Sequence, residues 1–268
     1  MYKKSLLPMI VDSYDSFSSV EKAIADYFLS NNERVDFSSK AMKERLFVSE
    51  ASLSRFAKKL GFKGYREFIY RYEEGFVEDN EPVSFEFQEV LELYRGLLNE
   101  TANYVDEDQI KSFCEMLQEA KHVVVFGIGS SGLAAKEMKF RFMRLGVMME
   151  ALERSDEMKM QSVMLGKESL AIGISLSGKK EEVVFSLKKA AQGGAKTIMI
   201  TANQNDDFSY CDQVIVVPSF KGLDAGHIIS PQFPVLVMLD VCYYYFYHNV
   251  ARMSCELHQK TLEVLSEG

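Results

Sequence analysis

Residues 122–132 read His-Val-Val-Val-Phe-Gly-Ile-Gly-Ser-Ser-Gly, and this stretch decides the fold of the larger, C-terminal part of the chain. Its first five residues are mostly apolar and β-branched, which is typical of a buried strand, and the glycines lead into a helical segment over residues 133–145. Further strand-like runs occur at residues 147–152, 170–174, 197–201 and 213–217. Their alternation with helical segments predicts an α/β domain with a parallel, five-stranded, doubly wound sheet flanked by helices.

The glycine-rich turn after the first strand is suited to binding an anion. Glycines let the backbone approach the ligand closely, and the N–H groups at the start of the following helix attract negative charge. Two serines in the turn add hydroxyl donors. We therefore predict Gly129, Ser130 and Ser131 as ligand-binding residues.

The same turn also fits the dinucleotide-binding fingerprint GxGxxG, formed by Gly127, Gly129 and Gly132. Glu150 lies near the end of the predicted second strand, at about the distance expected for an acid that holds a ribose hydroxyl. A nicotinamide-dinucleotide-binding protein, either an enzyme or a redox sensor, is therefore one alternative function.

A second polar turn follows the predicted strand at residues 170–174. It has the sequence Ser-Leu-Ser-Gly-Lys-Lys and begins another helix. A dinucleotide site does not need this turn, whereas a sugar phosphate can place its phosphate in one turn and its hydroxyls in the other. The arrangement resembles the sugar isomerase (SIS) domain, whose S-x-S-G-x-[ST] turn grips a phosphate. The resemblance implies that Ser175, Ser177 and Gly178 bind the ligand.

Lys180 departs from the SIS pattern, because it stands where the pattern has a serine or threonine. A lysine here supplies a positive charge to a phosphate, or it marks a pocket altered for another anion. We include Lys180 among the predicted ligand-binding residues.

The N-terminal part of the chain contains four helical segments, at residues 19–31, 39–46, 49–60 and 65–76. The middle two are short and joined by a tight turn, as in a helix-turn-helix motif. If Leu53, Phe56 and Leu60 face the core, the polar residues of the third segment face outward. The predicted DNA-binding residues are Ser49, Glu50, Ser52, Ser54, Arg55, Lys58, Lys59 and Lys63.

Arg55 is the best single candidate for a bidentate contact to guanine, while the lysines are placed to neutralise phosphates. The local charge supports this interpretation. Residues 38–72 contain nine lysines and arginines and three glutamates, a net +6, whereas the whole chain carries −8. A basic segment on an acidic chain is typical of a DNA-binding head on an acidic body.

Residues 48–65 read Val-Ser-Glu-Ala-Ser-Leu-Ser-Arg-Phe-Ala-Lys-Lys-Leu-Gly-Phe-Lys-Gly-Tyr and resemble the recognition-helix segment of RpiR-type (MurR/RpiR) transcriptional regulators. With the SIS-like part, the resemblance covers nearly the whole chain. It implies a non-enzymatic regulator of sugar metabolism that binds operator DNA and a phosphorylated sugar and requires no cofactor. It also implies a homodimer or homotetramer.

Catalysis is the other alternative, because SIS domains also occur in sugar-phosphate isomerases. Such an enzyme needs a general base and a ring-opening group, and Glu182 and His227 are the only candidates. Nothing in the sequence pairs them, and an isomerase has no use for the basic N-terminal part. We therefore predict no catalytic residues.

The domain boundaries follow from residues 78–86, an acidic segment with one proline and no apolar periodicity that is typical of a linker. We predict a helix-turn-helix domain at residues 1–77 and an SIS-type domain at 87–268. The last helix is expected at residues 230–252, with its tyrosines in the core or against a partner subunit. Four scattered cysteines, no visible metal site and no membrane-spanning segment predict a cytoplasmic protein with free thiols.

Overall fold

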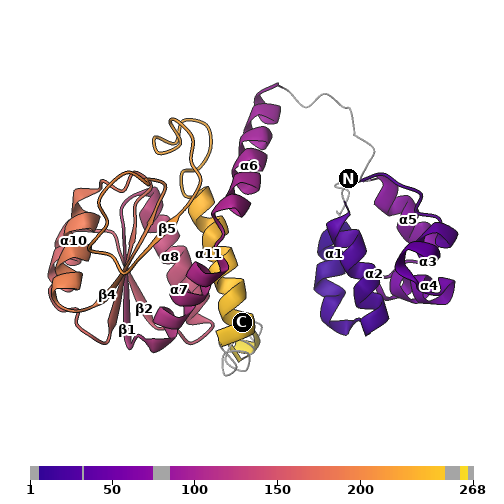
Figure 1. The fold of residues 1–268 in the computed structure, drawn as a ribbon, viewed down its shortest axis with the longest axis horizontal. Coiled ribbons are helices and arrows are strands. Elements are labelled where there is room, and N and C mark those ends of the chain that lie inside the picture. Colours follow the sequence, from indigo (N-terminus) through magenta and orange to yellow (C-terminus); the bar gives the residue numbers. More distant parts are fainter. Residues whose placement is uncertain (1–5, 32, 75–84, 251–259, 265–268) are drawn as a thin grey trace. The chain divides into compact units, whose positions relative to one another are not determined.

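The computed structural model of this protein describes residues 6–31, 33–74, 85–250 and 260–264. The chain divides into two compact units, residues 1–83 and 84–268, and each is described by itself (Figure 1). The first unit, called the head below, contains α1 (Leu6–Ser13), the short 3-10 helix η1 (Tyr14–Ser16), α2 (Ser19–Ser30), α3 (Ser39–Leu46), α4 (Glu50–Lys59) and α5 (Tyr65–Glu74).

The head is held together by aromatic side chains from several helices. Phe28 of α2 lies at the centre, where its ring packs edge-on against Phe68 and Tyr72 of α5, at centroid distances of 4.9 and 4.8 Å. Phe56 of α4 stacks on Phe28 at 6.1 Å. Since these rings are almost fully excluded from solvent, they fix how α4 is mounted on the other helices.

Serine side chains set where three of the helices of the head begin. Ser18, Ser38 and Ser49 each accept a hydrogen bond from a backbone N–H in the first turn of α2, α3 and α4, respectively. At α2 the cap is reciprocal, because the Glu21 carboxylate also accepts from the backbone N–H of Ser18. These caps confirm the helix starts predicted at residues 19, 39 and 49–50.

The second unit contains α6 (Phe85–Tyr104), α7 (Glu107–Glu119), β1 (His122–Gly127), α8 (Ser130–Met143), β2 (Met149–Leu152), α9 (Ser155–Ser162), β3 (Ser169–Ile174), α10 (Glu181–Gln192), β4 (Lys196–Thr201), β5 (Gln213–Val216) and α11 (Phe233–Tyr245). A π-helical turn, η2 (Phe246–Val250), continues α11. All four strand pairs are parallel, and the order in the sheet is β2-β1-β3-β4-β5. The predicted parallel, five-stranded α/β fold is confirmed.

Helices cover both faces of the sheet. Side chains of α7, α8 and α11 share one apolar core with alternate strand residues such as Val123 and Ile172. Side chains of α9 and α10 share a second core with the residues between them, such as Val124 and Ala171. Figure 1 shows α10 on one side of the sheet and α7, α8 and α11 on the other. The near-continuous apolar runs of the strands follow from this double covering.

The structure differs from the sequence predictions at element ends and in helices α1, α6 and α7, which were not predicted. Helix α8 starts at Ser130 rather than residue 133, because the N–H groups of the glycine turn already belong to its first turn. Helix α6 starts at Phe85, inside the segment predicted as a linker, and residues 78–84 of that segment lie outside the described residues. The last helix starts at Phe233 rather than residue 230, since Pro234 favours the first helical turn.

The last two residues of the helical segment predicted at 65–76 and the fourth cysteine, Cys255, also lie outside the described part of the chain. Of the other cysteines, Cys114 and Cys242 are buried and Cys211 is half-buried, all as free thiols. No helix in the described part of the chain combines the length and apolarity needed to cross a membrane.

Candidate functional site

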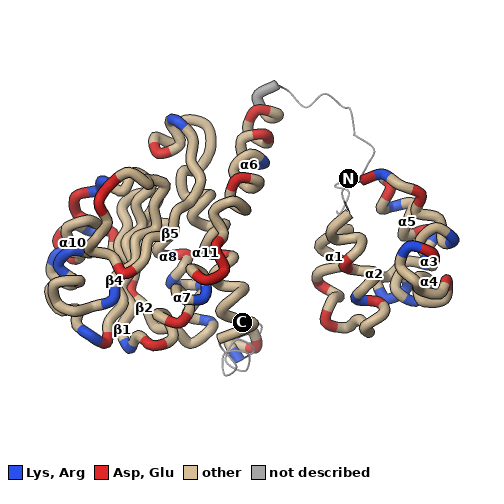
Figure 2. The backbone as a smooth tube through the Cα atoms, in the orientation of Figure 1, with Lys and Arg blue, Asp and Glu red and all other residues tan. Residues whose placement is uncertain are grey.

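Helices α3 and α4 form the predicted helix-turn-helix, with residues 47–49 between them. Helix α4 contacts α2, α3 and α5 through one apolar face, in which Leu53, Phe56 and Ala57 are fully buried. The opposite face is exposed and basic. Figure 2 shows lysines and arginines along α3, α4 and α5 of the head. This arrangement leaves one side of α4 free to enter a groove, as major-groove recognition requires.

Arg55 is exposed, and its guanidinium is already oriented by a neighbour. Its Nη2 donates to Ser52 Oγ at 3.1 Å, and that oxygen also lies 2.9 Å from Ser49 Oγ. Ser52, which we predicted on the outer face, is instead only 7% exposed. It lies one turn before Arg55 on α4, so its hydroxyl supports the arginine from the helix side. Ser49, Glu50, Lys58 and Lys63 are exposed, and Ser54 is half-buried.

Lys59 lies on α4 but its ammonium is directed into the head. It pairs with the buried Glu21 carboxylate at 2.7 Å and donates to the carbonyl of Ser16 at 2.9 Å. Burial raises the pKa of Glu21, but hydrogen bonds from Lys59 and Ser18 and the charge of Lys59 outweigh burial and hold that pKa below its usual range. Glu21 thus caps α2 and ties it to α4, so Lys59 positions the candidate recognition helix.

We expect Lys59→Met to destabilise the head by about 2 kcal/mol, because it leaves the Glu21 carboxylate buried without its cationic partner. Hydrogen exchange of peptides from α2 and α4 in the full-length protein measures this loss. Lys58→Met removes the same charge from an exposed neighbouring position. It should change the free energy of unfolding derived from the exchange rates by less than about 0.5 kcal/mol.

The same ion pair gives the head an acid dependence with a defined sign. Because the pKa of Glu21 is lowered in the fold, the pair stabilises the head above the usual glutamate pKa, and this contribution is lost as the pH falls through the lowered pKa. The loss should be smaller in Lys59→Met. Equal acid sensitivity in parent and variant would contradict the assignment.

The second candidate site lies at the carboxyl ends of β1 and β3. These strands are neighbours, with Gly127 opposite Ile174 in the register, but the chain leaves β1 for β2 on one side and then crosses back to β3. Such a reversal of strand order is where open α/β sheets bind ligands. The two turns predicted to bind the ligand begin at these two residues, so the fold brings them together.

Both turns present unpaired polar groups. The Ser175 side chain is 1% exposed, and its Oγ has no hydrogen-bond partner among the described residues. Helices α8 and α10 begin at Ser130 and Glu181 without a side-chain cap, so the N–H groups of their first turns remain open to an anion. Lys180 precedes α10 and is exposed. An uncompensated buried hydroxyl is costly, which points to a group that is satisfied when a ligand is bound.

Glycines at both turns have backbone angles that other residues rarely adopt. Gly129 has a φ of 61° and ψ of −126°, and it sets the direction in which the chain enters α8. Gly178 has a φ of 69°, and a Cβ on it would lie 2.8 Å from the ring of Phe208. A side chain at either position would be strained, so each glycine is needed for the shape of its turn.

The turn after β3 is held from β4 by residues that the sequence analysis did not single out. Asn203 Nδ2 donates to the carbonyl of Ser177 at 2.8 Å, and the hydroxyl of Thr201 donates to the carbonyl of Leu176 at 3.2 Å. Ser177 Oγ accepts from the N–H of Lys179 at 3.2 Å. Polar residues at the ends of neighbouring parallel strands lie at the same edge of a sheet, so Thr201 and Asn203 could be recognised once β4 was known to lie beside β3.

Two hollows adjoin the turn after β3. The smaller, of about 190 Å³, lies at the carboxyl ends of β3, β4 and β5 and is lined by Leu176, Ser177, Ala202, Asn203, Ser219 and Asp224. Its lining is rich in hydroxyl, amide and carboxylate groups that can bind a polyol. It does not include the turn after β1.

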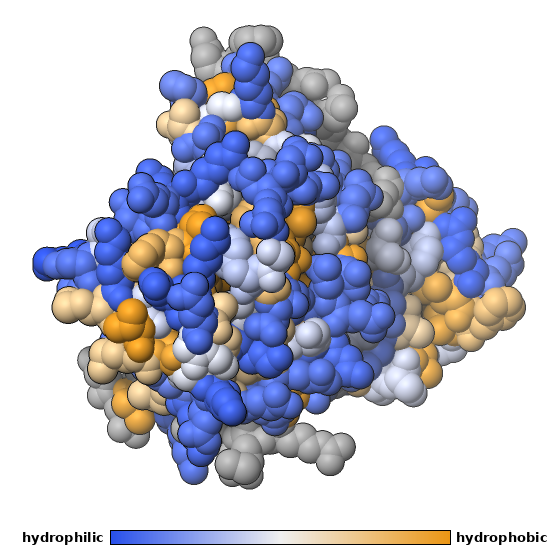
Figure 3. Space-filling model, turned by 60° about the vertical axis from the view of Figure 1, so that its left-hand side comes forward, coloured by the Kyte–Doolittle hydropathy of each residue, from blue (hydrophilic) through white to orange (hydrophobic). Residues whose placement is uncertain are grey.

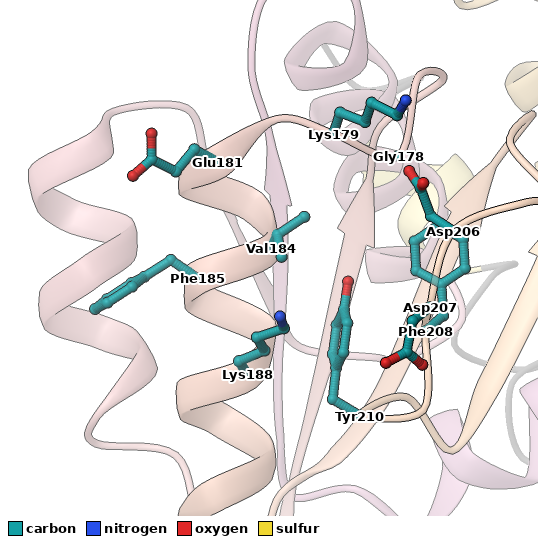
Figure 4. Close-up of a pocket in the computed structure, with 10 residues that line it drawn as sticks. All are labelled: Gly178, Lys179, Glu181, Val184, Phe185, Lys188, Asp206, Asp207, Phe208 and Tyr210. Carbon is teal, nitrogen blue, oxygen red and sulfur yellow. The ribbon is translucent and has the colours of Figure 1, made fainter.

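The larger hollow, of about 580 Å³, lies between α10 and residues 206–210 and shares only Gly178 with the predicted site. Figure 4 shows Val184 and Lys188 pointing across it toward Tyr210, while Glu181 and Phe185 point away. On the α10 side of the molecule, turned forward in Figure 3, apolar patches alternate with hydrophilic side chains. The open polar groups of the two turns lie at the strand-order reversal.

The residues behind the alternative functions are not gathered in one site, although Glu182 lies in the first turn of α10. Glu150 is the second residue of β2, opposite Val124, and its carboxylate lies 3.3 Å from His122 Nε2. It is therefore about 10 Å short, along the strand direction, of the turn that follows Gly127. Glu182 and His227 line neither of the two hollows.

The fold and the two sites define the class: a helix-turn-helix head in one chain with an SIS-type α/β domain. Residues 4–76 match the family model of the helix-turn-helix domain of the rpiR family, and residues 116–216 match that of the SIS domain. The chain is 30% identical to an HTH-type transcriptional regulator of Haemophilus influenzae, over 98% of this chain and 97% of the relative. It is 26% identical to another of Clostridium perfringens, over 83% and 85%. This protein belongs to the rpiR family of helix-turn-helix transcriptional regulators with an SIS domain.

Two solved structures share the fold. The Vibrio vulnificus NanR protein, complexed with ManNAc-6P, aligns with a TM-score of 0.62 at 20% identity and 98% coverage of both chains. The sugar isomerase domain of an RpiR transcription factor from Sphaerobacter thermophilus aligns with a TM-score of 0.59 at 21% identity, over 67% of this chain and 97% of that one.

Proposed function

We propose that this regulator binds operator DNA sequence-specifically through its head and binds a phosphorylated sugar as effector at the carboxyl ends of β1 and β3. The observation that carries the effector site is the buried Ser175 Oγ, which has no partner in the part of the chain that the structure describes, together with two helix N-termini that lack a side-chain cap. The similar NanR structure, which holds ManNAc-6P, supports a phosphosugar as the ligand class.

At the effector site, the phosphate is assigned to the two turns and the sugar to the smaller hollow. Gly129, Ser130 and Ser131 offer N–H and hydroxyl donors from α8, and Ser175, Ser177, Gly178 and Lys180 offer donors and charge from the start of α10. Adjacent strands are about 4.8 Å apart, so the ends of β1, β3 and β4 lie within about 10 Å. One hexose phosphate spans this edge, with its hydroxyls facing Asn203 and Asp224.

In the head, α4 is assigned to the major groove. Arg55 reads a guanine, Ser49, Glu50 and Ser54 lie near the base edges, and Lys58 and Lys63 contact phosphates. Ser52 and Lys59 were predicted as contacts, and here they orient Arg55 and α4. We propose a homodimer or homotetramer, since two heads related by a twofold axis match a palindromic operator.

A thermal-shift screen of the full-length protein tests the effector assignment. The panel contains hexose, pentose and N-acetylhexosamine phosphates, their unphosphorylated counterparts and NAD(H). Stabilisation by a sugar phosphate and not by its free sugar is expected, because ligand binding to the folded state raises the melting temperature. Stabilisation by NAD(H) alone would favour the dinucleotide-binding alternative instead.

A further inference from the structure

Phe47 combines two unfavourable features at the turn between α3 and α4. Its side chain is 94% exposed, although it is a large aromatic ring. Its φ of 52° and ψ of 38° are left-handed, and among the described residues no other non-glycine residue has a positive φ. Bulky residues rarely adopt this conformation, because their Cβ approaches the following carbonyl. Strain of this kind, held in place by the surrounding fold, is concentrated at functional positions.

The neighbours of Phe47 place its ring beside the candidate recognition helix. Two residues later, Ser49 caps α4. Val48, between them, packs against the core of the head, so the turn is anchored while Phe47 projects outward. Lys43 and Arg45 lie in the last turn of α3, so the ring has basic residues before it in the sequence. This setting suits an anionic partner with an apolar feature.

The exposed ring is isolated on this side of the head. The other large apolar side chains exposed on the described part of the head belong to α1, α2 and α5, and none belongs to α3 or α4. Protein–protein contacts use contiguous apolar patches rather than one ring. A single ring is suited to contact a single small apolar group. In the major groove, thymine is the only base that presents such a group, which is its 5-methyl.

We propose that Phe47 is a specificity residue that packs on a thymine methyl at the edge of each operator half-site. The inference rests on the proposed DNA-binding function and adds a contact that the polar residues of α4 do not provide. The backbone strain at Phe47 is retained because the left-handed turn aims the ring into the groove.

The test begins with selection of operator sequences from a random DNA library by the full-length protein. Each thymine of the selected site is then replaced singly by deoxyuridine, which lacks only the methyl group. At one thymine position in each half-site, we expect this replacement to lower the affinity of the protein for the operator about fourfold. That is the effect of losing one buried methyl contact. In Phe47→Gly the affinity should be similarly reduced, and the same replacement should then have no further effect.

Stability provides a second readout. Glycine accepts the left-handed conformation, so Phe47→Gly should raise the melting temperature of the head, by about 4 °C, while it weakens operator binding. Phe47→Asn, which also tolerates this conformation, should lose the same thymine preference. Tyr70→Ala removes another exposed aromatic, on α5, and should leave operator binding unchanged.

Operator binding by Phe47→Gly with the parent's affinity and thymine sensitivity would overturn the inference. Equal weakening on every sequence would also overturn it, because the ring would then contact the sugar-phosphate backbone or a protein neighbour. Failure of the parent to select any sequence would instead contradict the proposed DNA-binding function itself.

Discussion

Replacing Ser175 and Ser177 together by alanine is expected to abolish the thermal response to the phosphorylated sugar while operator binding without the sugar stays unchanged. The double variant removes both serine hydroxyls of the turn after β3. Hydrogen bonds to a charged phosphate contribute about 1.5–3 kcal/mol each, so two lost donors weaken the ligand by a factor of roughly 100 or more.

The ligand-free fold should tolerate this double variant. Among the described residues Ser175 Oγ has no hydrogen-bond partner to lose, and a buried unpaired hydroxyl is itself unfavourable, so alanine is neutral or stabilising there. Ser177 Oγ accepts one local hydrogen bond from the N–H of Lys179. The melting temperature of the unliganded protein, compared between parent and variant, measures this point.

Ser186→Ala is a matched control. Ser186 is fully buried and its Oγ has no partner among the described residues, but it lies on α10, among the residues that pack on the sheet. Its replacement should leave the ligand response intact. An unchanged ligand affinity in the Ser175/Ser177 double variant, measured by calorimetry with the sugar phosphate found in the screen, would refute the phosphate site.

The fold could be predicted from the sequence because its strands are covered on both faces. The runs at residues 123–126 and 170–174 are apolar throughout, so periodicity and length sufficed to place β1 and β3. Element ends were less certain. Helix α6 was missed since its start adjoins an acidic segment, and its apolar residues pack around Leu97 in a small cluster with side chains from residues 220–233.

The residues of the candidate sites could be predicted only where the type of residue at a position itself indicates binding, as with glycine and serine after a strand. Glycines and serines after two strands revealed the sheet edge, whereas Asn203 became visible only once β4 was placed beside β3. On α4, helical spacing predicted Ser52 and Lys59 as exposed. Ser52 is buried, whereas Lys59 is exposed and nevertheless pairs with Glu21. A periodic pattern assigns positions around a helix but cannot show that a long lysine side chain bends back to Glu21. Nor can it show that the conformation of Phe47 is left-handed.

Arg55→Ala is expected to weaken operator binding by about 1–3 kcal/mol per half-site, or roughly 5- to 150-fold, and to relax the sequence preference at one position. The guanidinium is exposed and already oriented by Ser52, so little side-chain entropy is lost when it binds the O6 and N7 atoms of a guanine. Fluorescence anisotropy with the selected operator, and with variants at each guanine, measures both effects.

Two control variants distinguish the loss of guanine recognition from the loss of a positive charge that attracts the DNA phosphates. Arg66→Ala removes an exposed arginine of α5, outside the candidate recognition helix, and should lower the affinity little and equally for all sequences. Arg55→Lys keeps the charge but cannot form two parallel hydrogen bonds, so it should retain phosphate attraction and lose the guanine preference. Tight binding by Arg55→Ala, with the parent's sequence preference, would mean that α4 does not lie in the major groove with its Arg55 face toward the bases.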